Sequence, residues 1–179
     1  RYDITPELFE KQLAYLQGHG FVTITLDQLA AHLIDGTTLS ALKPIILTFD
    51  DGWENQYMHA FPLLKKYNML GTFYVFTNPI RKNEHFLTWY QLREMDAAGM
   101  TIGSHTLSHP YLDKLSLEQL MHEISESKKV LESELKKPVS HFATPFGYSS
   151  DLIMSTARDA GYLTSRIIDP DAYQTKDDL

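Results

Sequence analysis

Two adjacent carboxylates follow an apolar run in the first third of the chain. Residues 44–49 read Pro-Ile-Ile-Leu-Thr-Phe, and Asp50, Asp51 and Gly52 come directly after them. β-Branched and aromatic side chains suit a strand covered on both faces, and a glycine permits a sharp turn. Neighbouring carboxylates repel each other unless a positive charge lies beside them. The stretch therefore predicts a buried strand that delivers two acids to a cation, for which a metal ion is the obvious candidate.

Two histidines further along the chain could complete such a metal site. His105 and His109 lie four residues apart, again after a short apolar segment. Neutral imidazole is a good ligand for zinc and similar metals, and one Asp with two His has the ligand count of catalytic zinc. Structural zinc usually has four ligands and often uses cysteine, which the chain lacks. The pattern predicts one divalent ion with open positions, zinc before cobalt, nickel or iron.

Alternating strands and helices would position these side chains. Capping residues and apolar spacing predict helices from Thr5 to about residue 17, from Asp27 to about residue 35, and over 54–67, 88–98, 116–135 and 151–160. Strands are predicted over residues 21–26, 44–49, 71–77, directly before His105, and over 139–144 and 162–168. Such repeats favour a parallel α/β fold, in which the chemistry lies at the carboxyl ends of the strands.

Size and composition favour one soluble globular domain over residues 1–179. The chain is 43% apolar and 12% aromatic, and its net charge of −7 comes without a basic cluster. These values argue against nucleic acid and against an anionic membrane surface as partners. No apolar stretch approaches the ~20 residues of a membrane helix, so we expect no transmembrane segment.

Three motifs carry a family resemblance. Residues 48–52 (Thr-Phe-Asp-Asp-Gly) and 104–110 (Ser-His-Thr-Leu-Ser-His-Pro) resemble the first two motifs of the polysaccharide deacetylases, carbohydrate esterase family 4 with the NodB homology domain. Residues 142–147 (Phe-Ala-Thr-Pro-Phe-Gly) resemble the third motif. The resemblance implies an irregular (β/α) barrel, a distorted relative of the TIM barrel. It also implies a metal-dependent hydrolase that acts on acetylated polysaccharides or oligosaccharides outside the cytoplasm, in the extracellular space, the periplasm or the cell surface.

The resemblance also implies roles for individual residues. Asp50 would be the general base, and Asp51, His105 and His109 would be the metal ligands. The backbone N–H of Phe146 would donate to the oxyanion of the reacting carbonyl.

Aromatic faces pack on sugar rings, and this predicts substrate contacts beside the motifs. Trp53, Pro145 and Tyr148 are the candidates for substrate binding.

Two departures from the family pattern concern catalysis. Many members have an arginine where Ala143 stands, and that arginine orients the base; Arg166 is a candidate substitute. The family also uses a histidine as general acid, commonly in a motif towards the C-terminus, and none follows residue 147. In the branch that acts on β-1,6-linked poly-N-acetylglucosamine this histidine lies upstream of the first motif, so we expect a chain truncated at one or both ends and an incomplete barrel. His19, His85 and His141 lie in no recognisable motif.

The sequence is compatible with several polysaccharide substrates and with three hypotheses for the activity. Residues 142–147 match the Phe-Ala-x-Pro-aromatic-Gly form found in the poly-N-acetylglucosamine branch. This favours that polymer modestly over peptidoglycan, chitin and xylan, with N-acetyl or O-acetyl groups as the target. A second hypothesis, motivated by Ala143 and the missing acid motif, is a weak or inactive carbohydrate-binding relic. A third is a metallohydrolase of another amide, such as the family's imidase-like or allantoin-type relatives.

Overall fold

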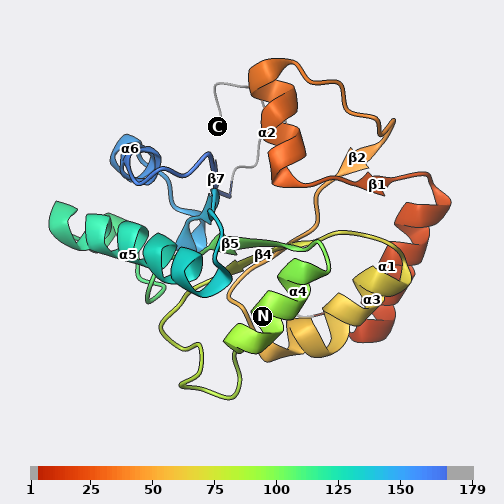
Figure 1. Cartoon of the computed structure of the whole chain (residues 1–179), viewed down its shortest axis with the longest axis horizontal. Helices are drawn as coiled ribbons and strands as arrows, with labels where there is room; N and C mark the ends of the chain where they lie inside the picture. The colour runs from red at the N-terminus through yellow and green to blue at the C-terminus, as the bar shows by residue number, and fades with distance from the viewer. Residues whose placement is uncertain (1–3, 169–179) are drawn as a thin grey trace.

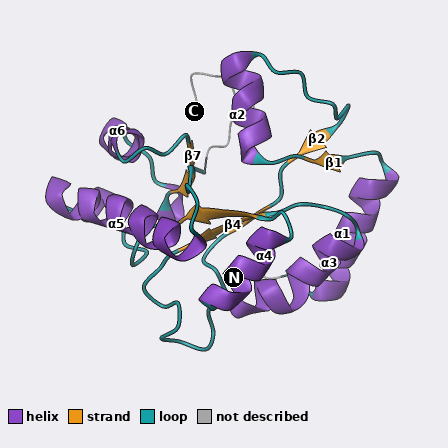
Figure 2. Ribbon diagram, viewed as in Figure 1, coloured by secondary structure: helices purple, strands orange, loops and turns teal. Residues whose placement is uncertain are grey.

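A five-stranded parallel sheet organises the molecule (Figures 1 and 2). The computed structural model describes residues 4–168 of the chain. The strands lie side by side in the order of the sequence, each parallel to the next. They are β3 (Thr48–Phe49), β4 (Thr72–Val75), β5 (Thr101–Ser104), β6 (His141–Ala143) and β7 (Thr164–Arg166). Parallel crossovers are right-handed, so a sheet that always advances in one direction keeps its helices on one face. The result is an open half of a (β/α) barrel, which confirms the predicted fold class.

Helices cover the outer face of this half barrel, and a separate unit lies on the opposite side. The outer helices are α1 (Pro6–Gly18), α3 (Phe61–Lys66), α4 (Trp89–Ala97), α5 (Leu117–Leu135) and α6 (Asp151–Asp159). Figure 1 shows α2 (Leu26–Asp35) away from them, beside the short parallel pair β1 (Val22–Thr23) and β2 (Pro44–Ile45). A π-helical turn (Gln56–Ala60) and two 3₁₀ turns (Leu112–Lys114 and Pro145–Gly147) complete the described elements. No helix within residues 4–168 has the length and apolar character needed to cross a bilayer.

Several helix starts follow the predicted capping chemistry, and one differs. Thr88 and Ser116 each form a capping box with a glutamine three residues later, as predicted for α4 and α5. The predicted cap at Asp27 is wrong, because Thr25 caps α2 in a capping box with Gln28. The helix therefore begins at Leu26, and the predicted strand over 21–26 shrinks to the two residues of β1.

The predicted strand over residues 44–49 is divided between two sheets. Its first two residues pair with β1, and its last two pair with β4. A continuous apolar run can pair with either neighbouring strand, so the sequence pattern alone does not show where pairing with β1 ends and pairing with β4 begins. The predicted helix over 54–67 is likewise interrupted by the π-helical turn. Pro62 lies in the first turn of α3, directly after this interruption.

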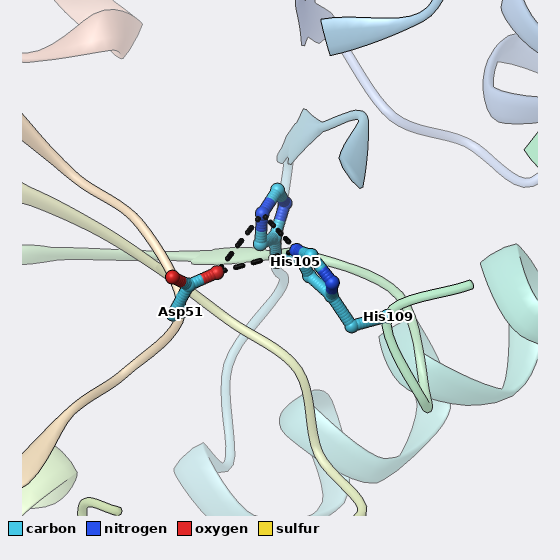
Figure 3. Close-up of side chains that lie close together, drawn as sticks. All are labelled: Asp51, His105 and His109. Carbon is cyan, nitrogen blue, oxygen red and sulfur yellow. Dashed lines mark hydrogen bonds and ion pairs between the residues drawn. The ribbon is translucent and has the colours of Figure 1, made fainter. Parts of the chain in front are cut away.

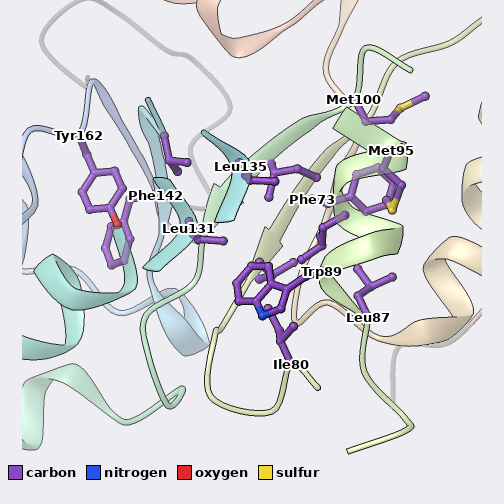
Figure 4. Packing of buried hydrophobic residues seen from close by; sticks show 14 of the residues in the cluster. Phe73, Ile80, Leu87, Trp89, Met95, Met100, Leu131, Leu135, Phe142 and Tyr162 are labelled. Atoms are coloured by element: carbon purple, nitrogen blue, oxygen red, sulfur yellow. The ribbon is translucent and has the colours of Figure 1, made fainter. Parts of the chain in front are cut away.

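The main hydrophobic core lies between the sheet and the outer helices (Figure 4). Phe73, Trp89 and Met95 gather where α4 meets the sheet, and Phe142 packs near Tyr162 at the other end. Side chains alternate along a strand, so the neighbours of Phe73 and Phe142 point into the concave side of the half barrel. There a second cluster joins Tyr74 and Ala143 to Leu26 of α2, with Leu29 and Ile46 packed against it.

A buried histidine ties α2 to the sheet on this concave side. The Nδ1 atom of His141 lies 2.9 Å from Oγ1 of Thr164 on β7, and its Nε2 atom lies 3.2 Å from Oδ1 of Asp27 on α2. Burial lowers the pKa of His141 below its usual value, although the Asp27 carboxylate opposes the shift and Lys128 and Lys137 add weakly to it. The folded protein therefore holds this imidazole neutral.

The free energy of unfolding is expected to decrease as the pH falls below about 6.5, the ordinary pKa of histidine. The unfolded chain binds a proton at residue 141 there and the folded protein does not, so protonation favours unfolding. His141→Asn should reduce the slope of unfolding free energy against pH by up to about 1.4 kcal/mol per pH unit. Urea denaturation between pH 7 and pH 5 with chelator present measures this. His122→Asn, at an exposed histidine of α5, is the control, and an equal slope in wild type and His141→Asn would contradict the expectation.

Candidate metal centre

A tight turn after β3 brings Asp51 to the carboxyl end of the sheet. Asp51 and Gly52 both have left-handed backbone conformations, with φ of 75° and 74°. A Cβ atom at Gly52 would lie only 2.8 Å from Cγ1 of Val75 on β4, so glycine is required there both by conformation and by space. The carbonyl of Gly52 accepts a hydrogen bond of 2.9 Å from the N–H of Leu87. The turn is thus fixed against the neighbouring strand and loop.

The three predicted ligands converge at this end of the sheet (Figure 3). Oδ1 of Asp51 lies 3.2 Å from Nε2 of His109 and 3.6 Å from Nε2 of His105. The two Nε2 atoms are 3.2 Å apart, and all three ligand atoms lie within 4.8 Å of one another. One carboxylate oxygen and two imidazole nitrogens therefore face a single point.

The backbone of β6 determines which nitrogen of His105 is free. The Nδ1–H of His105 donates a hydrogen bond of 2.8 Å to the carbonyl oxygen of Ala143. The lone pair of the ring is then on Nε2, the atom that faces Asp51 and His109. Burial lowers the pKa of His105, which keeps the ring neutral and available as a ligand.

Helix α5 holds the loop that carries His109. One carboxylate oxygen of Glu123 accepts hydrogen bonds from the backbone N–H groups of Leu107 and Ser108, and the other accepts from the Ser108 hydroxyl. The N–H of His109 donates to Oγ1 of Thr106 at 3.0 Å. Thr106 and His109 both have left-handed backbones, with φ of 72° and 61°. Hydrogen bonds from outside the loop therefore maintain a backbone shape that side chains rarely adopt.

Asp51 is held as an anion by its neighbours. The hydrogen bond with His109 lowers the pKa of the carboxyl group, and a second bond from the indole Nε1 of Trp53, at 3.1 Å to Oδ2, adds to the shift. The second bond leaves Oδ1 directed at the two imidazoles. Trp53 thus lies where it was predicted, beside the site, and also orients a ligand.

Asp50 points to a different partner. Nη1 of Arg166 donates to both carboxylate oxygens of Asp50, at 3.0 and 2.8 Å. In the register of β6 and β7, Arg166 is the direct partner of Ala143, the position where many family members have arginine. The guanidinium lies over the ring of Tyr74, 6.0 Å from its centroid. The base candidate therefore has an arginine beside it, supplied by β7 at the opposite edge of the sheet from β3.

The third motif forms the edge of the site nearest His109. Phe146 has a left-handed backbone (φ 59°), and its ring meets His109 edge to face at 4.7 Å between centroids. Pro145 is buried, whereas Tyr148 is exposed and lies 6.1 Å from the ring of Tyr111. Of the predicted substrate contacts, Trp53 and Tyr148 are accessible and Pro145 has a structural position.

Other residues near the site gave no sequence signal. Glu123 reads as one acid among many on the charged face of α5, and Phe86 lies in a loop without a motif. Tyr111 comes directly after the second motif, but its position alone does not assign it a role.

The three histidines that lie in no recognisable motif differ in burial and in hydrogen bonding. His141 is buried and bonded through both ring nitrogens, and His19 binds the carbonyl of Tyr15 on α1. His85 is exposed, in the loop that pairs with Trp53.

The donor set fits a divalent metal ion. A carboxylate held ionised and two histidines, one of them with its tautomer fixed by a backbone carbonyl, are the ligands and supporting bonds of catalytic metal sites. This donor set accommodates zinc, cobalt, nickel or iron.

Known proteins that resemble the chain are named as deacetylases. The profile of the family described as polysaccharide deacetylase matches residues 40–165. A peptidoglycan-N-acetylglucosamine deacetylase of Bacillus cereus is 34% identical over 123 residues, which cover 68% of this chain and 55% of that protein. A poly-beta-1,6-N-acetyl-D-glucosamine N-deacetylase of Staphylococcus aureus is 27% identical over 173 residues, which cover 89% of this chain and 59% of that protein. The chain therefore spans less than two thirds of the length of each of these relatives.

A solved structure is also similar to the chain. The Streptococcus pyogenes deacetylase PplD in complex with acetate superposes with a TM-score of 0.86 at 30% identity, and the match covers 90% of this chain and 71% of that one.

Proposed function

Because the chain belongs to the polysaccharide deacetylase family, we propose that it hydrolyses the N-acetyl groups of a polysaccharide with the help of one divalent metal ion. The observation that carries the proposal is the convergence of Asp51, His105 and His109 beside a second, arginine-bound carboxylate. The strands that position the site form one five-stranded sheet, and α2 packs against its concave side, which supports a single catalytic domain.

Each residue of the site has a separate task in this proposal. A metal ion held by Asp51, His105 and His109 would polarise the acetamide carbonyl and acidify a water molecule. Asp50 takes the proton of the attacking water, and Arg166 holds its carboxylate in one orientation. The N–H of Phe146 donates to the oxygen of the carbonyl as negative charge develops on it.

We favour poly-N-acetylglucosamine among the polymers, at a site of action outside the cytoplasm. The form of residues 142–147 supports this choice, and so does the likeness to the staphylococcal protein, whose name specifies the β-1,6-linked polymer. Peptidoglycan is the runner-up, because the Bacillus cereus relative is named for it.

The arginine beside Asp50 favours an enzyme over a binding relic. The relic hypothesis rests in part on Ala143, where the family's base-orienting arginine is missing. Arg166 supplies a guanidinium to the same carboxylate from the paired position on β7, so the base is not left without a partner.

Acetate release tests the proposal directly. Zinc-loaded protein should release acetate from N-acetylglucosamine oligomers, lose this activity after chelation, and regain it when zinc or cobalt is added. Oligomers with β-1,6 and β-1,4 linkages compare the two substrates. Metal binding and glycan binding without acetate release would support the relic instead, and turnover of small cyclic amides alone would support the third hypothesis.

A further inference from the structure

Helix α5 contacts the residue directly before each of the two histidine ligands. These residues are Ser104 and Ser108, and they bond to Ser127 and Glu123 of α5, respectively. The two serines are four residues apart, and so are the two α5 residues. Residues four apart lie on one face of a helix, with about 5–6 Å between their Cβ atoms. One face of α5 therefore lies against the segment that carries both imidazoles. We call Glu123 and Ser127 the α5 brace.

The contact of the brace with Ser104 is buried in the core beside His105. Both serines are fully excluded from solvent, and their hydroxyl oxygens lie 2.8 Å apart. Ser127 donates its own proton to the carbonyl of Ile124 at 2.9 Å, so Ser104 donates the hydrogen bond that the two hydroxyls share. Ser104 in turn accepts from the N–H of Thr106 at 3.3 Å. The Ser104 hydroxyl thus connects α5 with the backbone after His105 as well as before it.

The contact of the brace with Ser108 holds the backbone before His109. Oε2 of Glu123 accepts from the N–H of Leu107 at 3.0 Å and from that of Ser108 at 2.9 Å, and Oε1 accepts from the Ser108 hydroxyl. On its other side, the carbonyl of Leu107 accepts a bond of 2.8 Å from the N–H of Asn78, in the loop after β4. This stretch of backbone is therefore fixed between α5 and that loop.

The segment between the two histidines is irregular, and Thr106 and His109 have left-handed backbones. In a helix, backbone hydrogen bonds would fix two side chains four residues apart; here the positions of the imidazoles depend on bonds to other elements. The two Nε2 atoms lie 3.2 Å apart, and zinc–nitrogen bonds of about 2.0–2.1 Å tolerate little displacement of either ring. Support from outside the segment therefore bears directly on metal binding.

We infer that the α5 brace is a positioning element of the metal centre, which sets the separation of the two imidazoles and thereby the affinity of the site for its metal ion. The inference rests on the proposed function, in which His105 and His109 bind that ion. The brace bonds to the residues beside the ligands, so it acts through the ligands. A purely structural role would instead lower the stability of the protein and leave the metal affinity of the folded protein unchanged.

Zinc titration of the purified chain against a competing chromophoric chelator tests this inference. Glu123→Ala should raise the zinc Kd by about 10- to 100-fold, the loss typical when a partner that supports a ligand is removed. Glu123→Gln keeps an oxygen acceptor for the backbone N–H groups and should recover most of the affinity. Ser127→Ala should raise the Kd by about tenfold, because Ser104 loses its acceptor.

Matched controls lie on the same helix. Glu126→Gln removes an acid that bonds to Lys129 of α5 itself, and Ser125→Ala removes a hydroxyl two residues from Ser127. Both controls should keep the wild-type zinc Kd.

Two further measurements separate positioning from folding. Urea denaturation with chelator present gives the stability of each metal-free variant. Cobalt-loaded protein reports the geometry of the ligands through its visible absorption spectrum, which should change in Glu123→Ala and Ser127→Ala. If Glu123→Ala does not fold, Ser127→Ala and Glu123→Gln decide the question.

An unchanged zinc Kd and cobalt spectrum in the folded alanine variants would overturn the brace, even if their metal-free stability fell. Acetate release by the zinc-loaded wild type is measured in parallel. If it occurs while the variants bind zinc as the wild type does, the brace fails and the deacetylase proposal stands. Weakened zinc binding in the variants without acetate release by the wild type gives the reverse result, and a wild type that binds no zinc overturns both.

Discussion

Asp51→Ala is expected to abolish stoichiometric metal binding. Oδ1 of Asp51 is the one oxygen that faces both Nε2 atoms, and its removal leaves two imidazoles without a charged ligand. Loss of a partner that merely supports a ligand typically costs 10- to 100-fold in metal affinity, so loss of the ligand itself should cost more than about a hundredfold. Elemental analysis after dialysis without chelator should find about one ion per wild-type chain and background in the variant.

The matched control is Asp35→Ala, at an exposed aspartate at the end of α2. It should retain the wild-type metal content. A full complement of zinc in Asp51→Ala, or none in the wild type when zinc and cobalt are supplied, would refute the centre described here.

Arg166→Ala is expected to reduce kcat for acetate release by about a hundredfold or more, with zinc affinity unchanged. Within residues 4–168 the Arg166 side chain donates hydrogen bonds to Asp50 and to none of the three ligands, so its loss frees the base without dismantling the metal centre. Misplacement of a reacting group by about 1 Å can cost a hundredfold in rate. Steady-state kinetics should place the loss in kcat more than in KM. Zinc titration of the same variant confirms that it is folded.

A second substitution makes this prediction specific to the guanidinium. Ala143 is the register partner of Arg166 and is fully buried against Tyr74, so an arginine at residue 143 needs the space that Arg166 leaves. The double variant Ala143→Arg, Arg166→Ala should recover part of the lost rate. Arg158→Ala, at an exposed arginine on α6, should behave as wild type. A positioning role would be excluded if kcat in Arg166→Ala equalled that of the wild type.

The convergence of the motifs could be predicted because each follows a strand of one parallel sheet. The carboxyl ends of such strands meet at one edge, so Asp51 and the two histidines had to be neighbours once the strands were recognised. The starts of α4 and α5 were equally readable, since the capping boxes of Thr88 and Ser116 are local patterns.

The features that escaped prediction depend on contacts between distant segments. Nothing in residues 44–49 shows that Ile45 pairs with β1 while Thr48 pairs with β4. Arg166 could only be suggested as a partner for Asp50, because the register that sets it opposite Ala143 belongs to the folded sheet. Glu123 accepts hydrogen bonds from the loop of His109, although α5 is separated from that loop in the sequence. The sequence around Glu123 does not distinguish this acid from the other acids of α5.

The left-handed backbone conformations at the site limit how the thermal stability of this protein can be increased. Asp51, Thr106, His109 and Phe146 each occupy a conformation that glycine adopts without penalty, at a cost of about 1–3 kcal/mol for a side chain. Glycine at any of them would relieve that strain, and at three of them it would remove a proposed ligand or the aromatic ring that contacts His109. Directed evolution for thermal tolerance alone would therefore favour changes that erode the reacting centre, and a selection that preserves it must reward turnover at the same time.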